Sequence, residues 1–364
     1  MSEQLLSSPA VLGPDGTLRP GWLLLHDGAV HRRGDGAPPG TPDLEPGYLA
    51  PGFVDVHCHG GGGAAFATTD PGQALLAAQF HGAHGSAHVM ASLVTASMDE
   101  LEAQVRALVP LAREGSIAGI HLEGPWLSPE HAGAHDPELL ARPRTEDVDR
   151  LLTAAEGHLR MVTLAPELPG SPAAIERLVS RGVTVAVGHT DVDEDGLRAA
   201  VTAGARVVTH LGNAMRPIHH RAPGPVPAAL ADERIGVELI ADGVHVHPEV
   251  LALFARAARS RILLVTDATP AAGRPDGRYL LGRLPVEVRQ GVARLDGGAL
   301  AGSTLTMDRA VRTAVAAGIP VADALASATR LPARAVGMAG TAGLLVPGAR
   351  GVLALDEDLQ IIPR

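Results

Sequence analysis

The 364-residue sequence contains no lysine, because all 30 of its basic residues are arginine. This absence excludes a catalytic lysine Schiff base, a P-loop lysine and a carboxylated-lysine metal bridge. The chain has one cysteine, Cys58, so an internal disulfide framework is excluded as well. Aromatic residues make up only 2% of the chain, which removes the stacking surfaces that proteins use to bind single-stranded nucleic acids.

The charge and hydropathy patterns exclude further classes of partner. The net charge is −10 at pH 7, which does not favour a nucleic-acid partner. The sequence has no apolar run long enough to span a bilayer, and its first residues lack the basic-then-apolar pattern of a secretion signal. With 46% hydrophobic and 19% charged residues, the composition is that of a globular protein with one or two domains. We therefore expect a cytoplasmic protein that binds neither membranes nor nucleic acids.

Short apolar runs rich in β-branched residues alternate with helical stretches along most of the chain. Continuous apolar runs are typical of strands that are buried on both faces. Eight such strands separated by helices predict a (β/α)8 TIM barrel. The eight runs lie at 53–57, 89–95, 117–123, 160–166, 183–189, 206–210, 236–242 and 261–267.

The two ends of the chain have a different pattern. Residues 21–28 and 344–362 have the pattern of strands and turns, and neither end has enough apolar residues to fold alone. We expect a small β-sandwich domain built from residues 1–50 and 341–364, with the barrel at 51–340. The strand-like segment 279–300 is expected to add a hairpin after the eighth strand.

Polar residues that suit metal binding follow directly on the apolar runs. Because all strands of a barrel end on one face, these side chains are expected to meet there, although they are far apart in sequence. Imidazoles and carboxylates together favour a first-row metal, with zinc or iron as the obvious occupants. Any one histidine after a strand is more often a plain loop residue, so the prediction depends on the whole set. The set is His57, His59, Glu123, His189, His210 and Asp267.

Several motifs give the chain a family resemblance. The segment 51–60 resembles the opening strand of the amidohydrolase superfamily. More specific are Gly-Ile-His-Leu-Glu-Gly-Pro-Trp-Leu at 119–127 and Thr-His-Leu-Gly-Asn-Ala-Met at 209–215, together with 133–137, 188–191, 242–245, 266–268 and 301–308. In this order they resemble the N-acetylglucosamine-6-phosphate deacetylases over nearly the whole chain.

The resemblance implies an activity and a role for each matching residue. The activity is metal-dependent hydrolysis of the acetamido group of an amino-sugar phosphate. Glu123, His189 and His210 match the main metal ligands, and His57 and His59 match ligands of a second metal that some members bind. One or two divalent metals per subunit are thus implied, and without lysine Glu123 would be the bridge between two.

The remaining roles implied by the resemblance concern catalysis and substrate. Asp267 matches the catalytic carboxylate, while His135 and His245 match residues that hold the amide carbonyl and the sugar. Asn213 and Ala214 match phosphate contacts. Arg221 matches a phosphate-binding arginine that reaches in from a neighbouring subunit, which implies a homodimer.

One difference from the family's pattern leaves other functions open. Between Trp126 and His135 many relatives carry basic residues, but here only His131 can become positive. This weakens the case for tight phosphate binding. The alternatives are a deacetylase or cyclic-amide hydrolase that acts on a different or unphosphorylated substrate, and a non-catalytic sugar-phosphate sensor.

Overall fold

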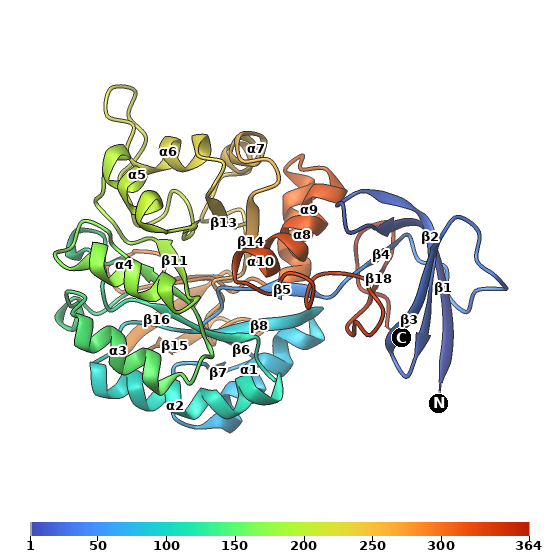
Figure 1. The fold of residues 1–364 in the computed structure, drawn as a ribbon, viewed down its shortest axis with the longest axis horizontal. Helices are drawn as coiled ribbons and strands as arrows, with labels where there is room; N and C mark the ends of the chain where they lie inside the picture. The colour runs from blue at the N-terminus through green and yellow to red at the C-terminus, as the bar shows by residue number, and fades with distance from the viewer. Residues whose placement is uncertain (1, 364) are drawn as a thin grey trace.

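Eight parallel strands form the centre of the molecule in the computed structural model, which describes residues 2–363 (Figure 1). The strands pair in chain order, and the first and last meet where the Asp267 backbone N–H donates to the His57 carbonyl at 2.8 Å. The strands are β5 (Phe53–Asp55), β8 (Ser86–Leu93), β9 (Gly119–Glu123), β10 (Leu159–Leu164), β11 (Thr184–Val187), β12 (Val207–Val208), β13 (Gly236–Ile240) and β14 (Ile262–Val265). The predicted TIM barrel is confirmed.

Helices surround the barrel and bury their apolar sides against it. Local sequence sets their ends: α2 starts with a capping box, in which Ser97 and Glu100 bond to each other's backbone N–H, and stops at Gly115 in a left-handed conformation. The helices are α1 (Pro71–Ala83), α2 (Met98–Glu114), α3 (Thr145–Ala154), α4 (Ser171–Ser180), α5 (Glu194–Ala203), α6 (Pro225–Ala231), α7 (Pro248–Ala257), α8 (Met307–Ala316), α9 (Val321–Ser327) and α10 (Arg330–Ala335).

A separate five-stranded sheet combines the two ends of the chain, as expected for the small β domain (Figure 1). Its order is β18-β4-β1-β2-β3, so the C-terminal strand is joined to the N-terminal ones through β4. The strands are β1 (Glu3–Leu12), β2 (Leu18–His26), β3 (Ala29–Asp35), β4 (Tyr48–Ala50) and β18 (Leu353–Leu355). Leu6, Leu23, Leu49 and Val352 belong to its own apolar core. The domain boundaries at residues 50 and 341 stay a prediction.

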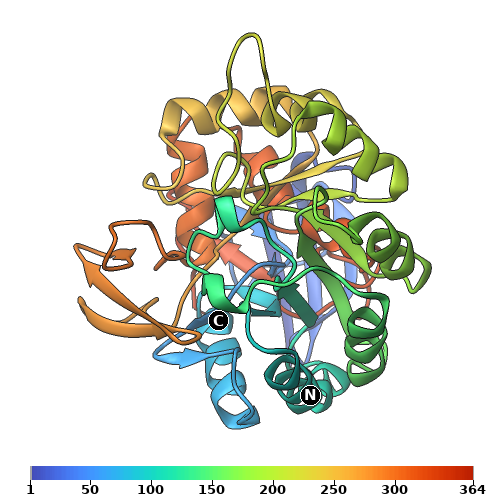
Figure 2. The same ribbon diagram turned by 90° about the vertical axis from the view of Figure 1, so that its left-hand side faces the viewer.

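Several small elements lie beside the barrel opening. The segment expected to form a hairpin is a three-stranded antiparallel sheet with its own small core. In Figure 2 the short helices η1 and η2 cross the opening, and a loop between α5 and α6 projects beyond the barrel in both views. The elements are β15 (Gly277–Leu281), β16 (Leu284–Arg289), β17 (Val292–Arg294), β6 (Gly60–Gly61), β7 (Ala64–Ala65), η1 (Pro129–His131) and η2 (Pro137–Leu139). None of the helices between residues 2 and 363 has the length and apolar character of a membrane span.

Candidate active site

A cavity of about 380 Å³ lies at the carboxyl ends of the barrel strands. Loop residues Glu130, His131, Gly133 and Ala134 line one part of it, and Leu281 at the end of β15 lines another. His57 is fully buried and is not among the residues that line the cavity. Nine residues predicted from the sequence line the cavity: His59, Glu123, His135, His189, His210, Asn213, Ala214, His245 and Asp267.

The turns that carry three of these residues have an unusual backbone. His189, His210 and Asp267 have φ values of 48°, 27° and 48°, in the left-handed region that L-residues rarely adopt. Each strand ends two residues before the turn residue, since β11 stops at Val187, β12 at Val208 and β14 at Val265. The backbone therefore turns sharply at each strand end, and such strained positions are typical of functional sites.

Glu123 lies at the centre of the predicted metal ligands. Its Oε1 atom is 3.0 Å from His189 Nε2 and 3.0 Å from His210 Nε2. Its Oε2 atom is 3.1 Å from His59 Nε2 and 3.5 Å from His57 Nε2. Each carboxylate oxygen thus faces one pair of histidines, which is the arrangement expected of a bridge between two metal positions.

The spacing of the donor atoms fits first-row metal ions. The Nε2 atoms are 3.1 Å apart in the pair His57–His59 and also in the pair His189–His210. Asp267 Oδ1 lies 3.3 Å from His59 Nε2, so it borders the first pair. Tetrahedral zinc with bonds of about 2.0–2.1 Å places neighbouring ligand atoms about 3.3 Å apart. The residues present therefore fit the implied metal.

The second ring nitrogens show which way the imidazoles face. Nδ1 of His57 is 3.0 Å from the Glu238 carboxylate, and Nδ1 of His189 is 2.9 Å from the His131 carbonyl oxygen. Nδ1 of His59 is 3.2 Å from the carbonyl oxygen of Ser92. These oxygens can only accept a hydrogen bond, so Nδ1 carries the hydrogen and the Nε2 atoms of the three rings face Glu123 and Asp267.

The electrostatics of the cluster favour positive charge. Burial lowers the pKa of His59, but Asp267 and Glu123 raise it more strongly, to about 9. Burial raises the pKa of Asp267, yet His57 and His59 bring it down to about 2. The pKa of Glu123 is also well below its usual value, since the surrounding histidines outweigh its burial. Both carboxylates are therefore ionised at neutral pH, and a metal cation could replace the imidazole protons as the positive charge beside them.

His135 differs from the four central imidazoles, which are the rings of His57, His59, His189 and His210. Its Nδ1 accepts a hydrogen bond from the backbone N–H of Thr95 at 3.2 Å, so the proton of the neutral ring is on Nε2. Burial and the neighbouring His189 lower the pKa of His135 to about 4, which keeps the ring neutral. Its Nε2–H points towards Glu123 Oε2 at 3.3 Å. His135 is therefore a hydrogen-bond donor in the cavity, with no lone pair left for a metal.

His245 is held by a residue that the sequence analysis did not single out. Asp242 accepts the Nδ1–H of His245 at 2.7 Å and also the backbone N–H groups of Val244 and His245. This fixes the ring with Nε2 free towards the cavity. The three-residue spacing of Asp242 and His245 was the available signal, since both fall in the motif at 242–245.

The predicted phosphate contacts are not all brought together. Asn213 and Ala214 line the cavity, but Arg221 lies on the exposed projecting loop, with its guanidinium 2.7 Å from His220 Nε2. The described residues that line the cavity include no arginine. Among these lining residues, a phosphate would thus meet no permanently charged cation.

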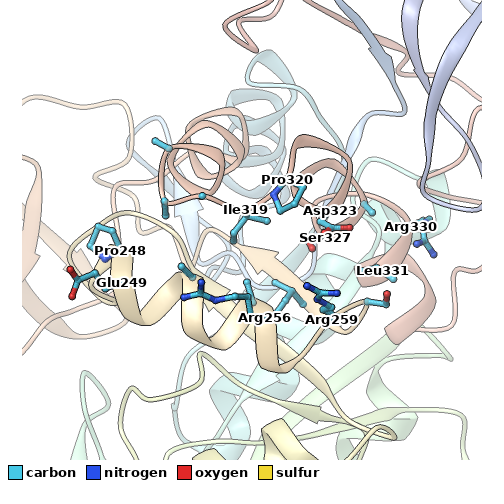
Figure 3. Close-up of a pocket in the computed structure, with 18 residues that line it drawn as sticks. Pro248, Glu249, Arg256, Arg259, Ile319, Pro320, Asp323, Ser327, Arg330 and Leu331 are labelled. Carbon is cyan, nitrogen blue, oxygen red and sulfur yellow. The ribbon is translucent and has the colours of Figure 1, made fainter.

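A second cavity, of about 420 Å³, lies outside the barrel between α7 and the helices α8–α10 (Figure 3). Arg256, Arg259 and Arg330 line it together with Asp323, while the rest is largely alanine and other apolar side chains. None of the residues predicted for the site lies there. The imidazoles and carboxylates converge at the barrel cavity instead, which makes that cavity the candidate active site.

Comparison with known proteins relates the chain to a family of hydrolases. The model of the amidohydrolase family matches residues 48–362. An N-acetylgalactosamine-6-phosphate deacetylase of Escherichia coli O157:H7 is 37% identical over 98% of this chain and 96% of its own. An N-acetylglucosamine-6-phosphate deacetylase of Vibrio furnissii is 34% identical over 92% of this chain and 84% of its own.

Comparison with a solved structure shows that the similarity extends to the three-dimensional fold. It is a mutant N-acetyl-D-glucosamine-6-phosphate deacetylase of Mycobacterium smegmatis in complex with N-acetyl-D-glucosamine-6-phosphate. It is 46% identical, with a TM-score of 0.94 over 99% of this chain and 97% of its own. The fold and the family resemblance predicted from the motifs are both confirmed.

Proposed function

The chain belongs to the amidohydrolase family, and from this we propose that it hydrolyses the acetamido group of N-acetylglucosamine 6-phosphate to glucosamine 6-phosphate and acetate. The observation that carries the proposal is the convergence of four imidazoles and the ionised Asp267 around Glu123 at the barrel cavity. A binding protein without catalysis would have no need for the carboxylate. The proposed setting is the cytoplasm.

In the proposed amide hydrolysis, different side chains bind the metal, transfer the proton and hold the substrate. His57, His59, Glu123, His189 and His210 would hold one or two divalent metals, with zinc or iron as the candidates. Such a metal supplies Lewis-acid chemistry, by making water more acidic and polarising a carbonyl oxygen.

Asp267 and His135 would act directly on the reacting groups. The Asp267 carboxylate accepts a proton from the attacking water and later passes it to the nitrogen of the departing amine, serving first as general base and then as general acid. The Nε2–H of His135 donates to the amide carbonyl oxygen and stabilises the negative charge that develops on it. His245 would bind the sugar hydroxyls through its free Nε2.

The sugar itself is tested by steady-state kinetics on a substrate panel. The panel contains N-acetylglucosamine and N-acetylgalactosamine, each with and without a 6-phosphate. We expect the highest kcat/KM with N-acetylglucosamine 6-phosphate. The galactosamine epimer is the second candidate, because the E. coli relative is named for it. Hydrolysis of none of the four sugars would contradict the proposal.

We also propose that the protein is a homodimer in which Arg221 binds the phosphate of the partner subunit's substrate. The loop that carries Arg221 projects from the barrel (Figure 2), and Ile218 on it is 54% exposed. Ile218 and Val250 line an apolar hollow of about 340 Å³ beside the loop, and Leu253 is 54% exposed near by on α7. Exposed apolar surface of this kind is typical of a contact between subunits.

Arg221→Ala is expected to raise KM for the 6-phosphate about 10–100-fold, as for the loss of a charged hydrogen bond worth about 1.5–3 kcal/mol. The unphosphorylated sugar should be nearly unaffected. Parallel kinetics with both substrates measure the difference. Arg256→Ala, an exposed arginine of the outer cavity in Figure 3, is the matched control and should change neither KM. Equal impairment of both substrates by Arg221→Ala would contradict a phosphate contact.

A further inference from the structure

Glu238 is a buried carboxylate behind the metal centre and has no role in the reaction described so far. It lies on β13, and its side chain is 0% exposed, as is that of His57. One of its oxygens, Oε2, accepts the Nδ1–H of His57 at 3.0 Å. The same oxygen accepts the backbone N–H of His210 at 3.3 Å. Glu238 therefore contacts one residue from each of the two histidine pairs.

The partner of His57 is unlike those of the other central imidazoles. Nδ1 of His59 and Nδ1 of His189 each face a neutral backbone carbonyl oxygen. Nδ1 of His210 has no hydrogen-bond partner among residues 2–363. Within that range His57 is the one central ring whose Nδ1 is held by a carboxylate. The His57–His59 pair thus has a carboxylate behind one of its rings, whereas neither ring of the His189–His210 pair has a charged partner at Nδ1.

We propose that Glu238 is a positioning residue that sets the affinity of the His57–His59 half of the centre for a divalent cation. It does so in two ways. It keeps the proton of His57 on Nδ1, so that the Nε2 lone pair faces the centre, and it places a negative charge directly behind the ring. The inference rests on the proposed function, because it concerns the metal that the proposed reaction needs.

The physical reason is that a carboxylate is a stronger acceptor than a carbonyl. A proton shared with a carboxylate leaves more electron density on the opposite ring nitrogen, which makes that nitrogen a better ligand. Loss of such a partner typically weakens metal binding by about 10–100-fold. Burial strengthens the effect, because no water screens the charge of Glu238.

A double-mutant cycle on zinc affinity separates this role from a merely structural one. Zinc-loaded protein is titrated with a competing chelator for the wild type, Glu238→Gln, His57→Asn and the double variant. Glutamine keeps the size of the side chain, and its amide oxygen can still accept both hydrogen bonds, but it removes the charge. We expect Glu238→Gln to weaken zinc binding about 10–100-fold in the wild-type background. In the His57→Asn background its effect should shrink to about threefold or less, because the ring through which it acts is gone.

Leu239→Ala is the matched control for lost stability. Leu239 is the next residue on the same strand and is fully buried, and because side chains alternate along a strand it faces away from Glu238. Thermal unfolding of each variant shows that it is folded, and Leu239→Ala should bind zinc with wild-type affinity despite a lower unfolding temperature. Weakened zinc binding in this control would show that any loss of packing loosens the centre, which would overturn the assignment.

The outcomes distinguish this inference from the proposed function. Wild-type affinity in Glu238→Gln, or an equal loss in both backgrounds, overturns the role of Glu238 and leaves the deacetylase proposal intact. A wild-type protein that binds no zinc and deacetylates none of the panel sugars overturns the proposed function and the inference with it.

Discussion

Replacing Asp267 with asparagine is expected to lower kcat by about 10²–10⁴-fold, the range for a lost general acid–base group. KM should change little. The amide of asparagine cannot accept the proton of the attacking water, whereas the carboxylate of Asp267 is ionised and borders the His57–His59 pair. Asparagine is also suited to the left-handed φ of 48° at this position, so the turn is expected to survive.

The measurement is steady-state kinetics with metal analysis of the same preparation. Asp70→Asn is the matched control: Asp70 caps α1 outside the cavity, asparagine caps helices equally well, and kcat should stay at the wild-type value. An Asp267→Asn variant with full metal content and near-normal kcat would show that another group moves the proton.

Glu123→Gln is expected to lose metal and activity together. Each oxygen of Glu123 faces one pair of imidazoles, so the amide of glutamine turns an N–H donor towards one pair and removes the charge from both. The lost metal contribution of several kcal/mol corresponds to a fall in kcat of about 10³-fold or more.

Elemental analysis after dialysis against a chelator measures the metal per subunit, and kinetics on the same sample measure kcat. Glu130→Gln is the control, since Glu130 is an exposed carboxylate at the rim of the same cavity. It should keep both metal and activity. Retention of the full metal content in Glu123→Gln would remove Glu123 from the ligand set.

The sequence predicted the barrel well because its signals are local. The ends of helix α2 are set by caps at Ser97 and Gly115, which are encoded within a few residues. Seven of the eight strands were predicted two residues too long at their carboxyl ends, and only the end of β9 at Glu123 was predicted correctly. Apolar residues mark where a strand runs, but they do not show that the backbone at His189 and His210 turns into a left-handed conformation.

Residues that support the site were harder to predict than residues that line it. His57 and Glu123 follow apolar runs, so their position at the barrel opening could be deduced from the fold. Glu238 lies within a run, 181 residues from His57, and nothing in its neighbourhood indicates the contact. Thr95, which sets the tautomer of His135, was missed for the same reason. Such partners depend on packing between distant strands, which no local pattern encodes.

The left-handed turns at the ends of β11, β12 and β14 limit which substitutions the site can accept. Asparagine, aspartate, histidine and glycine tolerate this backbone, whereas β-branched and most long side chains do so only at a cost of about 1–3 kcal/mol. The backbone at positions 189, 210 and 267 therefore favours a short list of side chains, which includes the metal ligands histidine and aspartate. Glu123 lies in the extended backbone of β9, so this restriction on the type of side chain does not apply there. An exchange within this list, for example of histidine for aspartate or asparagine, is thus expected to change the chemistry at the barrel opening while leaving the turn intact.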